Sequence, residues 1–324
     1  MIWVALRRQR LQLITLLVLL VVGSAAVLIM RPMMLADLHS MGLEGCLTTG
    51  LEGCGKPKAP FQLAWYTPMR AAQLGLLVLP LLIGLFIGVP LLAREIEQGT
   101  HVLAFTQSVS RTRWMLTNIA VGLLPALVLV LAGQSLINWW LSAAGDLGPL
   151  RVGPFDMNVF GIQHIAPVVY TLFAFSLGLF TGVLARRLLT GMLITLVGFV
   201  VLRVALETLR FKLISPERKI TGLPDTAGVY GEVKQIRVDS GYLDAQGHVV
   251  PDEVASAAST QCKATSVDNT QFFPCMEQKG MAKHFTDMIT EPMAGQLHLV
   301  EGAIFLGVTA LLFAATLILV RRRT

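Results

Sequence analysis

The sequence predicts an all-α polytopic membrane protein, with six transmembrane helices and a small mixed extracytoplasmic domain between helices 5 and 6. Of its 324 residues, 54% are hydrophobic and only 14% are charged, and the mean hydropathy is +0.66. Such values are typical of membrane proteins and not of soluble globular chains. A helix needs roughly 20 mainly apolar residues to cross the hydrocarbon core, and six segments are long enough. A polar insertion without such a segment separates the last two.

The six apolar segments divide the chain into three regions. They are residues 12–30, 71–92, 115–141, 163–185, 188–206 and 299–320. The first follows the basic run RRQR, but it is longer than the 7–15 residues of a signal-peptide core and no small-residue cleavage site follows. We therefore interpret it as a retained anchor helix. The predicted regions are 1–206 with five helices, an extracytoplasmic domain at 207–297, and 298–324 with the sixth helix and a cytoplasmic tail.

Basic residues in the short loops predict the orientation. With the N-terminus in the cytoplasm, four short cytoplasmic segments carry 11 of the 26 basic residues and only two acids, Glu95 and Glu97. This asymmetry obeys the positive-inside rule and places both termini in the cytoplasm. The net charge of +6 is then mostly cytoplasmic anchoring and does not indicate a nucleic-acid partner.

The stretch GLEGCLTTGLEGCGKP contains a misleading match to a phosphate-binding loop. Residues 50–56 fit G-x-x-x-x-G-K, but Pro57 replaces the hydroxyl residue that would bind Mg²⁺, and no strand precedes the glycines. The stretch also falls in the predicted extracytoplasmic loop 31–70, where no ATP is held. We therefore expect no nucleotide site and no cofactor in this chain.

All four cysteines fall in segments predicted to lie outside. An even number of cysteines on the oxidising side of a membrane indicates disulfides. Three pairings are possible, and we favour the local ones, Cys46–Cys54 and Cys262–Cys275. Within the outside domain, VKQIRVDSGYLDAQGHVV predicts a hairpin that turns at AQG. The following PDEVASAASTQC predicts a capped helix that ends near Cys262.

Several residues within the spans are candidates for helix packing or for function. Gly84 with Gly88, and Gly178 with Gly182, have the G-x-x-x-G spacing that allows close helix packing within a subunit or between subunits. Ionisable groups inside spans are costly and are functional candidates. The candidates for a structural ion pair or an exit gate are Arg203, Glu207, Arg210, His298 and Glu301. Gln134 and Asn138, four residues apart, can join helices by hydrogen bonds or contact cargo.

Known enzyme signatures are absent from the sequence. The histidines never form H-x-x-x-H, and no G-x-S-x-G occurs. We therefore expect neither a metal site nor a catalytic residue.

The most informative segment is the predicted cytoplasmic elbow 93–114, AREIEQGTHVLAFTQSVSRTRW. Helix 2 is expected to continue beyond the bilayer and to end at Gly99, because glycine readily adopts the positive φ of a helix C-cap. Thr100 can then cap a short helix, and Ser110 can cap helix 3. Two acids, a glycine break, an amphipathic turn and two arginines indicate a structured element, whereas a mere connection could be much shorter.

This elbow resembles that of the ABC-2-type transporter permease family, which reads E-x-E-x-G-T, then a leucine-rich turn, then a Ser-Arg pair before an aromatic residue. The matching residues are Glu95, Glu97, Gly99, Thr100, Leu103, Ser110, Arg111 and Trp114, and Phe105 of the short helix is a further candidate coupling residue. The six helices, the cytoplasmic termini and the large insertion before helix 6 are also similar to that family. The N-terminal piece before residue 12 is shorter than the family's interface helix, and the outside domain is larger and contains cysteines.

The resemblance implies the permease subunit of a prokaryotic ABC exporter in the plasma (inner) membrane. In such a transporter the elbow is a coupling helix that docks on a separate ATPase subunit. The implied partners are two copies of that ATPase with Mg-ATP, a second permease copy or a paralogue, and membrane lipid. The cargo would be a hydrophobic or amphipathic drug, peptide or lipid. The alternative is a non-transporting sensor or assembly factor with an extracytoplasmic domain.

Overall fold

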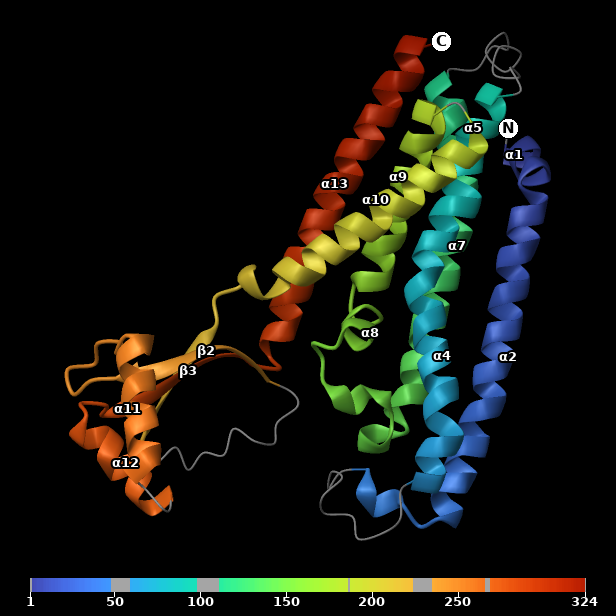
Figure 1. Ribbon diagram of the computed structural model, residues 1–324. Coiled ribbons are helices and arrows are strands. Elements are labelled where there is room, and N and C mark those ends of the chain that lie inside the picture. The colour runs from blue at the N-terminus through green and yellow to red at the C-terminus, as the bar shows by residue number, and fades with distance from the viewer. Residues whose placement is uncertain are drawn as a thin grey trace. The chain divides into compact units, whose positions relative to one another are not determined.

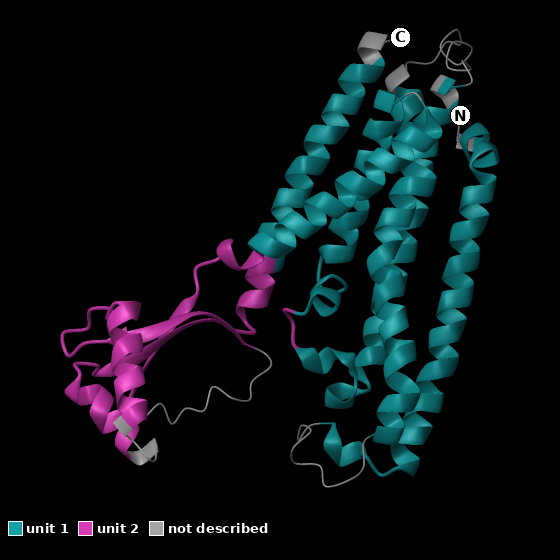
Figure 2. Ribbon diagram, in the orientation of Figure 1, with its two compact units in different colours: residues 1–152, 156–209, 298–324 teal, residues 153–155, 210–297 magenta. Residues whose placement is uncertain are grey.

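A computed structural model describes residues 2–47, 59–97, 111–185, 187–223, 235–265 and 269–323. The chain forms two compact units (Figure 2). Unit 1 comprises residues 1–152, 156–209 and 298–324, and it contains the membrane-spanning helices. Unit 2 comprises residues 153–155 and 210–297 and contains a small sheet with two helices.

The six predicted membrane spans are confirmed. Among the residues that the structure describes, six helices are long and apolar enough to cross a membrane (Figure 1). The helices of unit 1 are α1 (Ile2–Arg8), α2 (Arg10–Ser40), α4 (Ala59–Ile83), α5 (Val89–Glu97), α7 (Arg111–Ser142), α8 (Met157–Phe160), α9 (Ala166–Ala185), α10 (Leu188–Leu209) and α13 (Met293–Arg323), with the π-helical turn η2 (Gly84–Gly88) and the 3-10 turns η1 (Glu44–Cys46), η3 (Gly145–Leu147) and η4 (Pro149–Val152). α4, η2 and α5 follow one another without a break and form the second span.

Two helices extend well beyond the predicted spans. α2 continues to Ser40 and α4 begins at Ala59, so the predicted loop 31–70 is largely helical. The hydropathy pattern ended these spans early because their outer turns carry polar residues. The structure provides partners for those groups. The guanidinium of Arg31 lies 3.8 Å from the ring centroid of Trp139, and the indole N–H of Trp65 donates to Asp37 at 2.9 Å.

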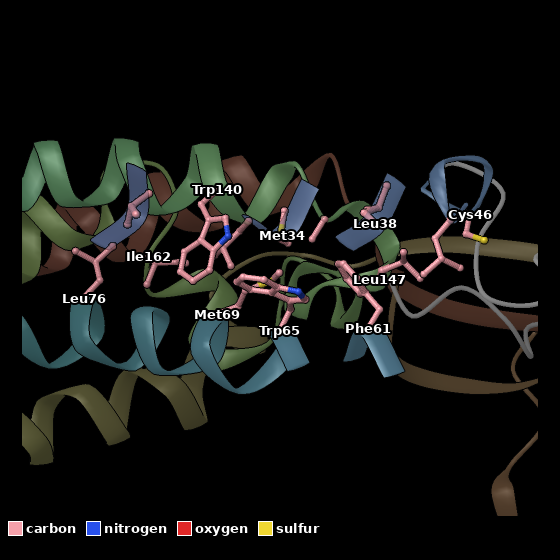
Figure 3. Packing of buried hydrophobic residues seen from close by; sticks show 14 residues of the cluster. Met34, Leu38, Cys46, Phe61, Trp65, Met69, Leu76, Trp140, Leu147 and Ile162 are labelled. Atoms are coloured by element: carbon pink, nitrogen blue, oxygen red, sulfur yellow. The ribbon is translucent and has the colours of Figure 1, made fainter. Parts of the chain in front are cut away.

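A buried apolar cluster joins the ends of α2, α4 and α7 (Figure 3). Met34 and Leu38 come from α2, Trp65 and Met69 from α4, and Trp140 from α7, and each has at most 8% of its surface exposed. Cys46 of η1 is buried in the same cluster. Its predicted partner Cys54 lies outside the described residues, so the Cys46–Cys54 bridge stays a prediction. The cluster gives the extended helix ends a hydrophobic core of their own.

Unit 2 contains a three-stranded antiparallel sheet in the order β1-β3-β2. The strands are β1 (Glu217–Gly222), β2 (Ile236–Leu243) and β3 (Lys283–Ile289), accompanied by α11 (Asp252–Thr265), α12 (Asn269–Gln278) and the 3-10 turn η5 (Arg210–Lys212). The expected turn after β2 is present, with Gly247 at φ +89°. The returning arm of the predicted hairpin forms one isolated bridge, Leu243 to Val249, whereas the strand that pairs with β2 along its length is β3.

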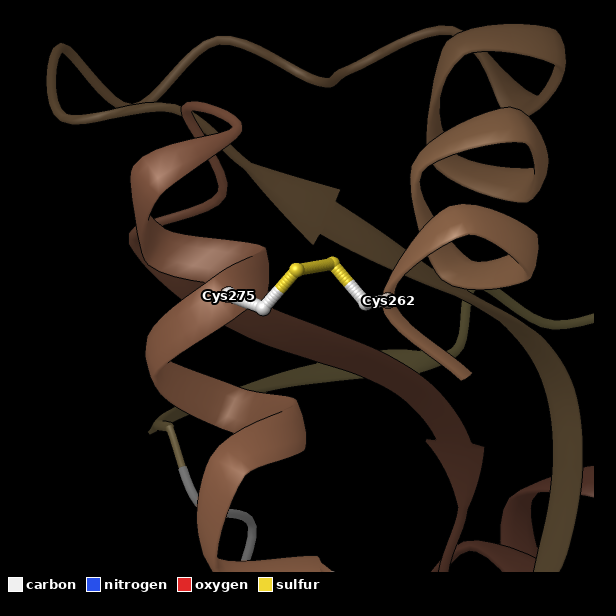
Figure 4. The surroundings of a disulfide bond; sticks show 2 residues. All are labelled: Cys262 and Cys275. Atoms are coloured by element: carbon white, nitrogen blue, oxygen red, sulfur yellow. A yellow bond between two sulfur atoms is a disulfide. The ribbon is translucent and has the colours of Figure 1, made fainter. Parts of the chain in front are cut away.

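A disulfide joins the two helices of unit 2 (Figure 4). Cys262 of α11 and Cys275 of α12 have Cα atoms 5.7 Å apart, which confirms the predicted local pairing. The predicted helix before Cys262 is confirmed as α11. Cys262 packs with Ala258, Met276 and Met281. The bridge thus supports a core that is small for a separate unit.

Candidate functional site

The two glycine pairs pack against each other within the chain. A Cβ atom on Gly84 would lie 2.5 Å from the carbonyl oxygen of Ala174. One on Gly178 would lie 2.5 Å from the carbonyl oxygen of Gly84, and one on Gly182 would lie 2.8 Å from that of Val89. Only glycine permits this approach, so the α4–η2–α5 span and α9 are in backbone contact. We name this contact the glycine seam (Gly84, Gly88, Gly178, Gly182). The intramolecular interpretation of these motifs is confirmed.

The π-helical turn η2 lies in the glycine seam, and Pro90 accounts for its position. A proline lacks the N–H that would bond to the carbonyl four residues earlier, and its ring clashes with that carbonyl. For Pro90 that carbonyl belongs to Phe86. The backbone widens here, and the N–H of Val89 bonds to the oxygen of Gly84, five residues back. Gln12 of α2 donates from Nε2 to the Phe86 oxygen at 3.0 Å, which replaces the missing backbone bond.

The predicted elbow is only partly within the described residues. α5 extends to Glu97, so helix 2 does continue beyond its apolar part as expected. Glu97 accepts a hydrogen bond through Oε2 from the backbone N–H of Leu188 at 3.2 Å. Leu188 begins α10, and a carboxylate is favourable there because the first N–H groups of a helix lack internal partners. The start of the elbow is therefore bound to the turn between α9 and α10.

The remaining elbow residues divide into two groups. The backbone of Glu95 is helical and Arg111 begins α7, but the side chains of both are outside the described set. The residues wholly outside it are Gly99, Thr100, Leu103, Phe105 and Ser110. Trp114 is half-buried in α7 and accepts a hydrogen bond through its backbone oxygen from Asn118. The role of the elbow stays a prediction.

Three helices meet at a buried ion pair inside unit 1. Arg203 of α10 donates from Nη1 to Oε1 of Glu301 in α13 at 2.9 Å, with side-chain exposures of 7% and 2%. Tyr170 of α9 donates its hydroxyl to the same Glu301 oxygen at 2.7 Å, and Arg203 Nη1 also bonds to the Tyr170 hydroxyl. The guanidinium carbon lies 4.1 Å from the Tyr170 ring centroid. We name this group the α9–α10–α13 triad (Tyr170, Arg203, Glu301).

The triad contains two of the five candidates for an ion pair or an exit gate, Arg203 and Glu301. Arg203 and Glu207 are one turn apart on α10, yet the described partner of Arg203 is Glu301, 98 residues away. Glu207 is half-buried on α10. Arg210 belongs to unit 2, where it is buried and donates to the Phe155 oxygen at 3.4 Å.

A second polar group is arranged around the turn that precedes α9. His164 has a left-handed backbone conformation with φ +50°, and Gln134 of α7 donates to its carbonyl oxygen at 2.7 Å. The His298 ring stacks on Phe160, with centroids 3.7 Å apart, and lies 4.5 Å from the His164 ring. Gln134 therefore joins α7 to this turn. Asn138, one turn further along α7, is half-buried and its Oδ1 takes no hydrogen bond from the described residues.

Sequence reasoning missed two residues that the structure places centrally. Tyr170 gives a weak signal, because a tyrosine inside a span must find a partner for its hydroxyl. Gln12 was placed at the edge of the first span, and nothing in its neighbourhood indicates that it bonds to Phe86. Both contacts depend on packing between segments that are far apart in sequence.

Comparison with known proteins gives one match. The family model described as ABC-2 membrane transporter related matches residues 17–210, which cover most of the first span, the second to fourth spans and nearly all of the fifth, and thus more than half of the chain. No curated protein and no solved structure matches the chain. The matched region contains the glycine seam and the elbow. Together with the six confirmed spans, this match shows that the chain belongs to the ABC-2 membrane transporter related family.

Proposed function

We propose that the chain is the permease subunit of an ABC exporter. It moves a hydrophobic or amphipathic cargo outward, while a separate ATPase subunit binds and hydrolyses Mg-ATP. The family supports a membrane subunit that works with an ABC ATPase. Two ATPase subunits and a second permease copy or paralogue complete the transporter. The chain resides in a prokaryotic plasma membrane with both termini and the elbow in the cytoplasm.

The observation that carries this proposal is the way the end of α5 is held. Glu97, at the start of the elbow, bonds to the first N–H of α10. Further along the same span, the glycine seam holds η2 and α5 in backbone contact with α9. A push on the elbow by an ATPase subunit therefore acts on α5, α9 and α10 together. Such rigid contact is what coupling between ATP hydrolysis and a distant gate requires.

The α9–α10–α13 triad is where this motion reaches the last helix. Arg203 and Tyr170 lie on α10 and α9, and both bond to Glu301 on α13. A displacement of α9 and α10 must therefore either carry α13 with it or separate a buried ion pair. We assign the triad to the gate of the transport path.

The test compares elbow variants in the full chain, co-expressed with the ABC ATPase subunit that co-purifies with it. Glu95→Ala with Glu97→Ala, and separately Gly99→Val, should abolish stimulation of the ATPase by the permease and export of a fluorescent amphipathic dye. Glu97→Gln retains an oxygen acceptor for the Leu188 N–H and should keep more activity than Glu97→Ala. The matched control is Glu44→Ala, which removes an exposed carboxylate outside the elbow.

Each variant must first be shown to insert and to purify as a single species. Wild-type coupling in both elbow variants would remove the coupling assignment. A wild-type chain that retains no ABC ATPase subunit from native membranes would favour the sensor or assembly factor instead.

A further inference from the structure

A groove of about 460 Å³ lies along α2 within unit 1. Its walls come from α1, α2, the α4–η2–α5 span and one residue of α7, Asn118. It does not include the triad, and it shares Arg94 with the predicted elbow 93–114 but does not include Glu97, which contacts α10. A volume of this size is typical of a small-molecule site.

The groove is polar at one end and apolar along the rest of its length. Arg8 and Arg94 line the polar end, and no acidic residue is among the described residues that line the groove. Partial burial lowers the pKa of the Arg8 guanidinium below its ordinary value. The apolar end is lined by Leu16, Leu19, Leu79, Leu82 and Ile83.

Hydrogen bonds connect the helices that form the walls of the groove. Gln12 bonds to the Phe86 oxygen in η2, and Gln9 donates to the backbone oxygen of Asn118 at 3.0 Å. Gln9, Gln12 and Asn118 themselves line the groove. Their hydrogen bonds fix α2 against the second and third spans, which makes the groove a built feature of the unit.

The open side of the groove has exposed apolar rims. Leu11 is 74% exposed, Phe86 is 59% exposed and Leu82 is 42% exposed, and all three line the groove. In a membrane-spanning bundle such side chains face the hydrocarbon. The groove therefore opens sideways to lipid, with its two arginines at the end where the spans meet the membrane surface.

We propose that this groove binds an anionic membrane lipid, with an acyl chain along the leucines and the phosphate at Arg8 and Arg94. The cationic end and apolar length match the two parts of such a lipid. From Leu11 to Leu19 the helix rises about 12 Å, enough for a substantial part of an acyl chain. Basic pockets between helices on the cytoplasmic side are typical lipid headgroup sites. Lipid binding at this site does not depend on ATP coupling. Failure of the lipid proposal would therefore not refute the exporter assignment, and the reverse also holds.

The test measures binding of two lipids to the purified full chain by native mass spectrometry in detergent. The probes are phosphatidylglycerol and phosphatidylcholine with identical acyl chains, each with and without excess inorganic phosphate. The charge variant is Arg8→Gln with Arg94→Gln. Its matched control is Arg7→Gln with Arg10→Gln, which removes the same charge from exposed neighbours that do not line the groove. Thr15→Trp fills the groove, and Ile14→Trp is its control on the adjacent exposed position.

We expect phosphatidylglycerol to bind more tightly than phosphatidylcholine. The charge variant should weaken phosphatidylglycerol binding about thirtyfold, from about 1 kcal/mol per arginine and 1.4 kcal/mol per tenfold. Thr15→Trp should weaken binding of both lipids, and neither control should do so. Equal effects of the charge variant and its control would overturn the proposal. So would displacement of the lipid by inorganic phosphate, which would assign the arginines to a free anion.

Discussion

Removal of Glu301 should destabilise unit 1 more than almost any other single side-chain deletion. At 2.9 Å and an effective dielectric constant of about 20, the attraction between Arg203 and Glu301 is about 6 kcal/mol before desolvation. Much of this offsets the burial of both charges. When only one partner is removed, the other remains buried without compensation, which typically costs about 3–5 kcal/mol. Tyr170 also loses its acceptor, which adds about 1 kcal/mol.

The prediction is therefore that Glu301→Ala and Arg203→Met each lower the free energy of unfolding by about 3–5 kcal/mol. The double variant Arg203→Met with Glu301→Leu should regain most of this loss, since it leaves no buried charge. Glu301→Gln should fall between wild type and Glu301→Ala, because its amide oxygen can still accept from Tyr170.

The assay is equilibrium unfolding of the purified chain by SDS titration in mixed micelles, followed by circular dichroism. Glu44→Ala is the control, because Glu44 pairs with His39 at a similar distance, 2.6 Å, but both side chains are mostly exposed. It should leave the transition unchanged. The reasoning is refuted if the single triad variants unfold like wild type, or if the double variant is as unstable as the sum of the singles.

Two further predictions concern other parts of the chain. Gly178→Ala should destabilise unit 1 by about 1–3 kcal/mol or more, because its Cβ would lie 2.5 Å from the Gly84 oxygen. The control Gly75→Ala, whose Cβ would have nothing within 4 Å, should be neutral or stabilising. Equal effects of the two variants in a thermal unfolding assay would contradict the glycine seam. In unit 2, Arg218 donates two hydrogen bonds of 2.7 Å to Asp287, and these bonds, with the arginine charge, lower the pKa of Asp287. Its stabilising contribution is therefore present above the unfolded pKa of about 3.9 and is lost as pH falls through the lower folded value. Asp287→Asn should abolish this loss of stability at acidic pH. A loss of stability of the same size in the variant would contradict the role assigned to the Arg218–Asp287 pair.

The membrane topology could be predicted because a helix that crosses the lipid must consist mainly of apolar residues, and these are visible in the sequence. Each span requires a long apolar segment, and all six were recognised. The glycine motifs were equally informative, since close backbone approach admits only the smallest residue. The prediction ended the first span too early, at Met30, and began the second too late, at Ala71, because polar residues such as Asp37 are accommodated there by partners from other helices.

The partners of buried polar groups could not be predicted in the same way. A spacing of four residues correctly brings Arg203 and Glu207 to one side of α10, but it does not determine which helix packs there. Glu301 is contributed by the last span, and Tyr170 by the fourth. Pro90 signals a distortion of the second span, but the widened turn and its bond to Gln12 depend on where α2 packs.

The widened turn at Gly84–Gly88 also means that the second span contains one residue more than a regular helix of the same length. If that turn closed to regular α-helix, everything beyond it would rotate by about 100° and advance by about 1.5 Å. Glu97 would then leave the Leu188 N–H, and the face that α5 presents to α9 would change. The Pro90 ring opposes such a closure, and Gln12 of α2 gives the Phe86 oxygen the hydrogen bond that Pro90 cannot provide, so the wide turn is stabilised by the second span itself and by the first.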